Sequence, residues 1–375
     1  MNSTDALTQA DTNKPNSLNS VISQVAGNSP LKDIPEDYSP ENCGQWFAIP
    51  QGVDAGKKLF FYDVVIGEGS PQATIVCVHG NPECSYSYRH VAQQLRINSK
   101  QCYRLIVMDH IGFGRSDQAS FEMVDKHHAQ NLQQLIIYLD LQQVTLVIHD
   151  WGGPIGIGAF IDEPERVAHL IVLNTTVFPI PRSGSTYENF PFPIKLLSWA
   201  ASGKNIPDGL WPTHAAYAVH AEPNTLLPTL GSYMAYFLKS FMGALPATHK
   251  VYKDMFGTKE NAKSSKRMVQ QTPVWGHGYQ YQDPVMGLQD NHGFYDNIQN
   301  NISRQWGPEG KNIQVRLLFG SWDPLAKESV IDQWLEALPQ LKGHVHLFKN
   351  TSHFVAEHKS VEISQAIIEV AGLGQ

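Results

Sequence analysis

The residue of greatest chemical interest is Asp150, in the run His149-Asp150-Trp151-Gly152-Gly153. An apolar segment, 144–148, stops abruptly at this acid, and small residues then open a helix that we predict over 152–160. This layout is typical of a nucleophile elbow, a tight strand-to-helix turn that lifts one reactive side chain into a cleft. Serine usually fills the reactive position, which here holds a carboxylate. A plainer interpretation is that Asp150 only caps the helix, a role that aspartate fills well.

A carboxylate nucleophile favours displacement at a saturated carbon. A serine that attacked an sp³ carbon would be left as a stable ether, whereas Asp150 would form an ester that water can open at the carboxyl carbon. General-base activation of that water contributes roughly 10²–10⁴-fold in rate. Asp150 must be ionised to attack. Burial raises the pKa of its carboxyl group, and we expect backbone N–H groups at the elbow and the helix N-terminus to lower this pKa by more.

Two further polar residues follow predicted strands. Asp323 comes after the apolar segment 315–319, and His353 comes after 344–348. Each alone would be an ordinary turn acid or loop histidine. Nucleophile, acid and histidine in this order, however, match the chain order of the α/β-hydrolase fold. The sequence therefore predicts that Asp150, Asp323 and His353 form a catalytic triad.

An upstream turn supplies candidate anion-binding groups. Asn81 lies in a Gly-Asn-Pro turn after the predicted strand 73–78. In this fold such a loop provides an oxyanion-hole group beside the backbone N–H of the residue after the nucleophile, here Trp151. The side-chain N–H groups of both residues are neutral donors for a leaving anion. The plainer interpretation of Asn81 is turn chemistry. We expect Glu83 to be exposed and His149 to pack or hydrogen-bond behind the nucleophile.

The surrounding pattern predicts an α/β fold. The predicted strands span residues 59–65, 73–78, 104–108, 144–148, 170–173, 315–319 and 344–348. Several are apolar throughout, as in strands covered on both faces. Apolar residues at helical spacing in 132–139 and 330–338 predict amphipathic helices between them. This alternation indicates a mostly parallel central sheet with helices on both faces, the α/β-hydrolase arrangement.

The composition suggests four consecutive parts. These are a polar tail at 1–45, a first part of the hydrolase core at 46–180, a mainly helical cap at 181–305 and a second part of the core at 306–375. We expect the tail to be disordered, because it has too few apolar residues to offset its ordering entropy. We expect the cap to fold over the carboxyl ends of the strands, where α/β sheets bind ligands.

Bulk properties narrow the partners. The chain has 375 residues, 42% hydrophobic content and a net charge of −7. It has no Lys/Arg cluster that would follow a phosphate backbone, so we expect no nucleic-acid partner. No apolar run is long enough to span a membrane, and no secretory signal is evident, so we expect a cytoplasmic protein. The four cysteines lack disulfide or zinc spacing. We expect a small hydrophobic substrate and no metal or organic cofactor, and the oligomeric state stays open.

Three segments carry a family resemblance: His79-Gly80-Asn81-Pro82, Asp109-His110-Ile111-Gly112-Phe113-Gly114-Arg115-Ser116-Asp117 and His149-Asp150-Trp151-Gly152-Gly153. Together they resemble the haloalkane dehalogenase group of the α/β-hydrolases. The likeness is strong from roughly Leu59 to Phe178, returns around Asp323 and His353, is weak across the cap and is absent from the tail. It is fairly specific, because related epoxide hydrolases usually carry an apolar aromatic residue where Asn81 stands.

The resemblance implies a hydrolase that displaces halide from an alkyl halide through an alkyl-enzyme ester, giving alcohol and halide. Asp150 would be the nucleophile, His353 the base that activates water and Asp323 the acid that orients this base. Asn81 and Trp151 would bind the halide. No metal takes part in this scheme.

This sequence departs from some dehalogenases at two places. One subgroup carries its orienting acid after the strand that precedes the cap, where this chain reads Asn174-Thr175-Thr176, so the acid is assigned to Asp323. Another subgroup uses a second tryptophan from the cap in place of Asn81. Three cap tryptophans could assist in this way: Trp199, Trp211 and Trp275.

Three other functions stay open. The same motifs resemble the β-lactone decarboxylases of bacterial olefin biosynthesis, which would release an alkene and CO₂, although 319–325 is unlike the sequence expected around their acid. An epoxide hydrolase would need two cap tyrosines, and four are available: Tyr217, Tyr233, Tyr279 and Tyr281. A non-catalytic binding protein on this scaffold would normally lack one member of the triad.

Overall fold

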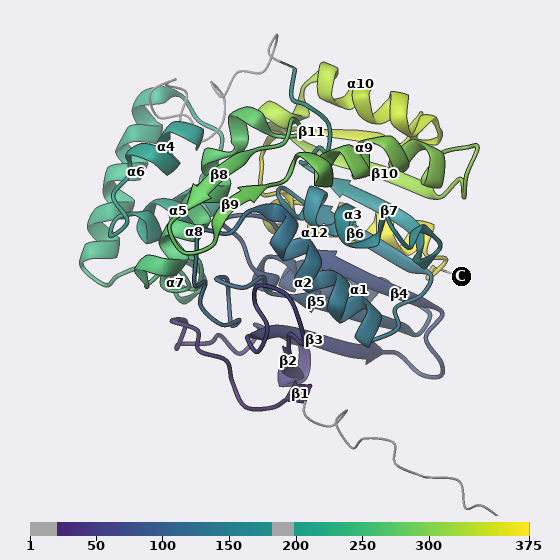
Figure 1. Cartoon of the computed structure of the whole chain (residues 1–375), viewed down its shortest axis with the longest axis horizontal. Helices are drawn as coiled ribbons and strands as arrows, with labels where there is room; N and C mark the ends of the chain where they lie inside the picture. The colour runs from purple at the N-terminus through teal and green to yellow at the C-terminus, as the bar shows by residue number, and fades with distance from the viewer. Residues whose placement is uncertain (1–20, 182–198, 375) are drawn as a thin grey trace, which may run out of the picture.

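A computed structural model describes residues 21–181 and 199–374 (Figure 1). Within these residues, nine strands form one sheet in the order β1-β2-β3-β5-β4-β6-β7-β10-β11. They are β1 (Ile22–Ser23), β2 (Gly44–Ala48), β3 (Lys58–Ile66), β4 (Ala73–Val78), β5 (Tyr103–Met108), β6 (Val144–His149), β7 (Val167–Leu173), β10 (Gln314–Trp322) and β11 (Val345–Ser352). Neighbouring strands from β5 to β11 are parallel, and β1, β2 and β3 extend the sheet antiparallel. The seven predicted strands are confirmed, and β1 and β2 lie outside them.

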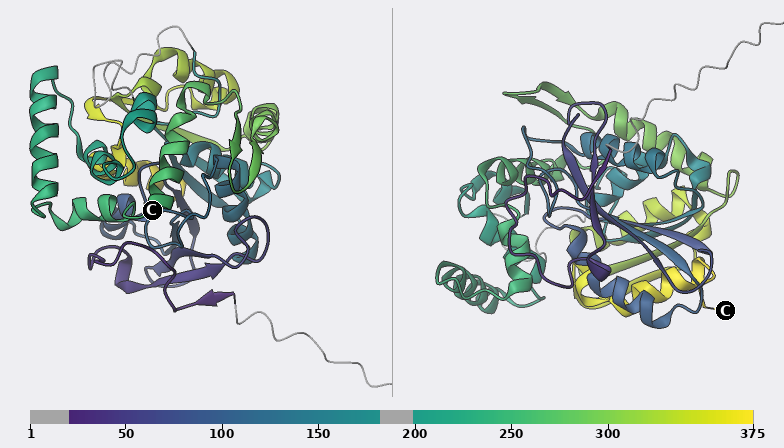
Figure 2. Two further views of the ribbon diagram at one scale, coloured as in Figure 1. Left: turned by 60° about the vertical axis from the view of Figure 1, so that its left-hand side comes forward. Right: turned by 90° about the horizontal axis from the view of Figure 1, so that it is seen from below.

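Helices cover both faces of this sheet (Figure 2). On one face α3 packs against α2 and α9, and on the other α1 packs against α12. The helices span α1 (Arg89–Asn98), α2 (Asp125–Tyr138), α3 (Gly152–Phe160), α9 (His292–Trp306), α10 (Glu328–Ala337), α11 (Val355–His358) and α12 (Ser360–Val370). The predicted helix 152–160 coincides with α3, and the amphipathic patterns in 132–139 and 330–338 fall largely in α2 and α10.

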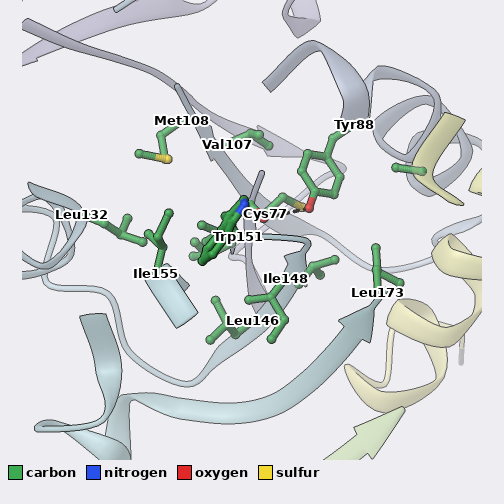
Figure 3. Close-up of a cluster of buried hydrophobic side chains, with 14 of the residues drawn as sticks. Cys77, Tyr88, Val107, Met108, Leu132, Leu146, Ile148, Trp151, Ile155 and Leu173 are labelled. Atoms are coloured by element: carbon green, nitrogen blue, oxygen red, sulfur yellow. Dashed lines mark hydrogen bonds between the residues drawn. The ribbon is translucent and has the colours of Figure 1, made fainter. Parts of the chain in front are cut away.

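The central strands form the most deeply buried part of the sheet. Every residue of β6 is buried, as are the last four of β4. Between them and the helices lies a cluster that includes Leu146, Ile148, Trp151 and Ile155 (Figure 3). Apolar contact on both faces explains why these strands lack polar alternation. The sheet edge that carries Asp150 is therefore anchored in the core.

The described residues between β7 and β10 are mainly helical. They include α4 (Trp199–Asn205), α5 (Trp211–His220), α6 (Leu226–Phe241), α7 (Ala247–Asp254) and α8 (Lys259–Gln270), and a hairpin of β8 (Gln280–Asp283) and β9 (Gly287–Asp290). These helices lie to one side of the sheet in Figure 1. The following helix, α9, packs on α3 of the core. The boundaries drawn between core and cap stay a prediction, and residues 182–198 of the predicted cap lie outside the described residues.

The prediction of a disordered tail over 1–45 is wrong for residues 21–45, while residues 1–20 lie outside the described part of the chain. β1 pairs with β2, and both Leu31 and Tyr38 are buried. The Tyr38 hydroxyl donates to Asp109 Oδ2 at 2.8 Å. A few apolar anchors and hydrogen bonds to the core order this segment despite its polar composition. Among the described residues, no helix is both long and apolar enough to cross a membrane.

Candidate active site

Asp150 stands at the turn between β6 and α3. Its backbone has φ = +51°, the left-handed conformation that lifts the side chain away from the strand. A Cβ atom on Gly152 would lie 2.2 Å from the Val78 carbonyl oxygen, so only glycine allows α3 to start this close to β4. The helix is capped at Trp151, and the Asp150 carboxylate makes other contacts. The capping interpretation of Asp150 is therefore wrong.

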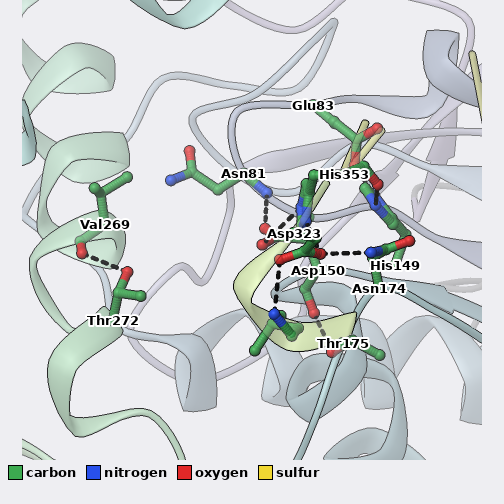
Figure 4. Close-up of polar contacts among 12 residues, drawn as sticks. Asn81, Glu83, His149, Asp150, Asn174, Thr175, Val269, Thr272, Asp323 and His353 are labelled. Carbon is green, nitrogen blue, oxygen red and sulfur yellow. Dashed lines mark hydrogen bonds and ion pairs between the residues drawn. The ribbon is translucent and has the colours of Figure 1, made fainter. Parts of the chain in front are cut away.

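The structure brings the three predicted triad residues together (Figure 4). His353 Nε2 lies 3.3 Å from Asp150 Oδ2, and His353 Nδ1 lies 2.6 Å from Asp323 Oδ2. The second Asp150 oxygen, Oδ1, accepts a hydrogen bond of 2.7 Å from the backbone N–H of Asn81. All three triad side chains are buried. One histidine thus joins two carboxylates that reach it from separate strand ends.

Asn174, at the end of β7, fixes the acid of the triad. Its side-chain amide donates to Asp323 Oδ2 at 2.5 Å, and its Oδ1 accepts from the Gly320 backbone N–H at 2.7 Å. The Leu325 backbone N–H donates to the other Asp323 oxygen at 2.8 Å. Asn174 occupies the place where one dehalogenase subgroup would carry its acid, and here it supports Asp323. Its position directly after a buried strand was the signal that could have found it.

The charges around His353 determine its protonation. Burial acts to lower the pKa of His353, but the charge of Asp323 and hydrogen bonds to both carboxylates outweigh burial and raise the pKa to about 10. The side chain is therefore an imidazolium at neutral pH before any reaction. The ion pair between Asp150 and His353 keeps the two side chains in contact.

Asn81 is oriented by the predicted cap as well as by its own turn. Its Oδ1 accepts a hydrogen bond of 2.5 Å from the Ser265 hydroxyl, and its Nδ2 donates to the Ser265 carbonyl at 3.1 Å. The Trp211 indole N–H in turn donates to the Ser265 hydroxyl at 3.0 Å. Because an amide carries two N–H groups, the second of Asn81 is left for another acceptor. Ser265 lies on α8, and sequence reasoning did not single it out.

Glu83 is buried, so the expectation that it is exposed is wrong. Its carboxylate bonds to His149 Nδ1 in a short contact, and His149 Nε2 donates to the His353 backbone carbonyl at 2.9 Å. Both imidazole nitrogens of His149 thus face oxygen acceptors, and the Glu83–His149 pair lies against the backbone of His353. The expectation that His149 bonds behind the nucleophile is confirmed.

Two tryptophans stack beside Asp150. Trp151 lies against Trp275 with ring centroids 3.9 Å apart and planes within 15°. The Trp275 indole N–H is occupied by the Thr176 carbonyl at 2.8 Å. Among the described residues, the buried Trp151 indole N–H has no hydrogen-bond partner. Of the three cap tryptophans considered above, Trp211 and Trp275 therefore have their N–H groups engaged within the protein.

The similarity to known proteins agrees with this geometry. The family model described as the alpha/beta hydrolase fold matches residues 73–359, well over half of the chain. The protein belongs to the α/β-hydrolase fold family. Solved structures support the same fold. Haloalkane dehalogenase DpaA from Paraglaciecola agarilytica NO2 aligns with a TM-score of 0.58 at 21% identity, covering 91% of this chain and 96% of that one. Epoxide hydrolase VrEH1 from Vigna radiata aligns with a TM-score of 0.53 at 18% identity, covering 87% and 96%.

Two kinds of named protein are similar to this chain by sequence. A cis-3-alkyl-4-alkyloxetan-2-one decarboxylase from Shewanella oneidensis is 28% identical over 320 residues, which cover 82% of this α/β-hydrolase and 83% of the relative. Haloalkane dehalogenase 2 from Mycobacterium tuberculosis is 30% identical over 136 residues, which cover 36% of this chain and 43% of the relative. The sequence match to this dehalogenase is thus more local than the match to the Shewanella decarboxylase.

In this α/β-hydrolase a small cavity of about 30 Å³ opens over the triad. Asn81 and the three triad side chains contribute to its wall. Its apolar lining consists of Ile180, Trp199, Trp275, Pro324, Leu325 and Phe354. Trp151 is not part of this lining, and neither are the four tyrosines considered for an epoxide hydrolase. No cluster that could hold a metal ion occurs among residues 21–181 and 199–374.

Proposed function

We propose that this α/β-hydrolase uses Asp150 as a covalent nucleophile and displaces halide from an alkyl halide. The observation that carries the proposal is the position of the Asp150 carboxylate, which faces an apolar cavity between the Asn81 backbone N–H and His353. A bond forms between a carboxylate oxygen and the substrate carbon, while the carbon–halogen bond breaks and halide leaves with its electron pair. An apolar wall favours this step because it removes water from the nucleophile.

Water then completes the cycle. Ester formation removes the negative charge that helps to keep His353 protonated, so the pKa of His353 falls and the ring releases its proton to solvent. Neutral His353 then takes a proton from the water that attacks the carboxyl carbon of the ester. The tetrahedral intermediate collapses, and the leaving alkoxide takes this proton from His353 and departs as the alcohol. The carboxyl group on residue 150 gives its own proton to His353, which restores the Asp150 carboxylate and the imidazolium. The same carboxylate thereby controls both halves of the reaction.

Two neutral donors could receive the halide. The second side-chain N–H of Asn81 is free of its bond to Ser265, and the buried Trp151 indole N–H has no partner within the described residues. Halide binding at Trp151 requires the Trp275 ring, which stacks on it, to leave the indole N–H accessible. Neither donor carries a charge that would pair with Asp150 and reduce its nucleophilicity.

Decarboxylation of a β-lactone is the second candidate. It is favoured by the decarboxylase from Shewanella oneidensis, whose likeness spans about four fifths of both chains. The triad would also suit this substrate, since ring opening likewise leaves an oxyanion that needs donors. The products, an alkene and CO₂, differ from those of the first candidate and can be measured separately.

Substrate turnover and a trapped intermediate test the proposal together. We expect the purified chain to release bromide and acid from 1-bromobutane, and Asp150→Asn to abolish the release. In His353→Gln the ester should accumulate, and peptide mass spectrometry should find a butyl group on residue 150. His358→Gln, which changes a nearby exposed histidine outside the triad, is the matched control and should keep wild-type turnover.

The remaining outcomes separate the candidates. Alkene and CO₂ from a synthetic cis-β-lactone, without bromide release from the haloalkane, would move the assignment to the decarboxylase. Turnover of either substrate by Asp150→Asn at the wild-type rate would refute the nucleophilic role itself.

A further inference from the structure

Helix α6 exposes an unusual number of large apolar side chains. Leu227, Met234, Leu238 and Phe241 are 79%, 67%, 58% and 93% exposed. The helix stands at the outer edge of the molecule, held mainly by α5 (Figures 1 and 2). Single exposed apolar residues are ordinary, but a contiguous apolar face on one helix marks an interaction surface.

The exposed residues follow a heptad. Positions 227, 231, 234, 238 and 241 are separated by intervals of four, three, four and three residues, which place them in one stripe along the helix. We call this stripe the α6 seam. The opposite face of the helix packs against α5, where Tyr233 and Tyr236 contact Tyr217. Thr213 and Ser240 share a hydrogen bond of 2.9 Å on the same face. A seam of this kind is what a second helix packs against.

The seam is complementary to itself when two copies run antiparallel. With Met234 opposite Met234 at the two-fold axis, Leu227 of one copy meets Phe241 of the other. Gly231 then lies opposite Leu238, so the smallest residue of the seam receives a large one. A Cβ atom added to Gly231 would meet nothing within 4 Å, so the space above it is open. Isologous dimers require this match of a surface with its own copy.

We propose that the α6 seam is the interface of a homodimer in which the two α6 helices pack antiparallel about a two-fold axis at Met234. The charge pattern favours a second copy over a lipid surface. Helices that lie on membranes are typically rich in Lys and Arg on their polar face. Lys239 is the single charged residue of α6, and the whole chain carries a net charge of −7. The proposal rests on this surface and is independent of the reaction at Asp150.

Charge exchange at the two-fold axis tests this pairing. Light scattering coupled to size-exclusion chromatography should give the wild-type chain twice the mass of one copy. Met234→Glu and Met234→Lys should each be monomeric, with the dimer dissociation constant raised by about 100-fold or more, because like charges meet across the axis. A mixture of the two variants should form a dimer again, since opposite charges then meet. Ile97→Glu on α1, which alters a side chain of similar exposure (65%), is the matched control and should stay dimeric.

Other outcomes would overturn the proposal. A wild-type chain that is monomeric at every concentration tested would remove it, as would Met234→Glu and Met234→Lys variants that remain dimers. Failure of the mixture to reassociate, with both variants folded by circular dichroism, would exclude the antiparallel pairing. Flotation of a monomeric wild-type chain with phosphatidylcholine vesicles, lost in Met234→Glu, would assign the seam to a lipid surface instead.

Discussion

One buried histidine, His353, and a cluster of three others lie near Asp150. Their surroundings favour a protonated ring for His353 and neutral rings for the cluster. His353 sits between two carboxylates, and its pKa is raised to about 10. His79, His110 and His128 instead form a cluster, with neighbouring ring centroids 4.2 and 5.0 Å apart. Burial lowers the pKa of His110 to about 4 and lowers those of His79 and His128 well below their ordinary value. Burial alone makes a histidine neutral, and only carboxylates reverse this.

The two groups also do different work. In the cluster, His79 Nε2 accepts from the His110 backbone N–H at 3.0 Å, and His110 Nε2 bonds the His79 carbonyl at 2.9 Å. Because its Nε2 accepts, His79 must be neutral with its proton on Nδ1, and His110 must carry a proton on Nε2 to donate to the carbonyl. His79 directly precedes the turn of Asn81, so the cluster holds a loop of the site. His353 must instead gain and lose a proton during the proposed reaction.

Removing the carboxylate beside His353 should have the largest effect. In Asp323→Asn the pKa of His353 should fall from about 10, since the charge that raises it most is gone. The ring would also lose its fixed orientation, and the same change in serine-protease triads lowers kcat by about 10⁴-fold. Turnover measured from pH 5 to 10 checks both effects. Asp332→Asn, an exposed aspartate on α10, is the control, and an equal loss in that variant would contradict this explanation.

His149 is an intermediate case, with one carboxylate instead of two. Glu83→Ala would leave His149 Nδ1 buried without its partner, and breaking a buried pair typically costs about 3–5 kcal/mol of the free energy of unfolding. Glu83→Gln should cost less, because an amide can still donate to Nδ1 while Nε2 keeps the His353 carbonyl. Urea denaturation and kcat should both rank wild type above Glu83→Gln and Glu83→Ala last. Stability of both variants equal to that of wild type would show that the pair contributes nothing.

Features that depend on local sequence pattern could be predicted, whereas contacts between residues far apart in the chain could not. Asp150, Asp323 and His353 each follow a strand of the parallel part of the sheet, and parallel strands bring their carboxyl ends to one edge of a sheet. Local pattern and chain order therefore sufficed to predict the central strands and the meeting of these three side chains, and the catalytic roles stay a prediction. The family likeness supported the same residues, although the reaction itself stays a proposal.

Distant contacts left no local signal. Asn81 bonds Ser265, which is 184 residues away in the sequence. Ser265 lies on α8, in the region where the family likeness is weak. Glu83 follows a turn, where an acid is normally exposed, and only the folded chain shows that it meets His149. The order of residues 21–45 likewise depends on a few bonds to the core, such as that from Tyr38 to Asp109, which composition cannot reveal.

Direct titration should resolve the two histidine groups. With ¹⁵N-labelled histidine, NMR should show His353 as an imidazolium from pH 5 to 8 and the rings of His79, His110 and His128 as neutral. In the unfolded chain His110 takes up a proton near pH 6.5, whereas in the folded protein it does so near pH 4. The free energy of unfolding therefore falls as the pH drops between these values. For His110 alone this loss is about 2 kcal/mol from pH 7 to 5. An imidazolium signal from the cluster at pH 6 would contradict this.

The smallest effect is expected where a cluster histidine makes no bond. Among the described residues neither nitrogen of His128 has a hydrogen-bond partner, and the ring is fully buried. His128→Leu should therefore change the free energy of unfolding at pH 7 by no more than about 1.5 kcal/mol, the range for a buried apolar residue of similar volume. At pH 5 the variant should be more stable relative to wild type than at pH 7. Its unfolded chain lacks the histidine whose protonation stabilises the unfolded state of wild type. His346→Gln, an exposed histidine on β11, should leave this pH dependence unchanged. A His128→Leu variant that loses as much stability as wild type between pH 7 and 5 would show that the pKa of His128 is the same in the folded and unfolded chains, and one that loses more would place His128 with His353 instead of with the cluster.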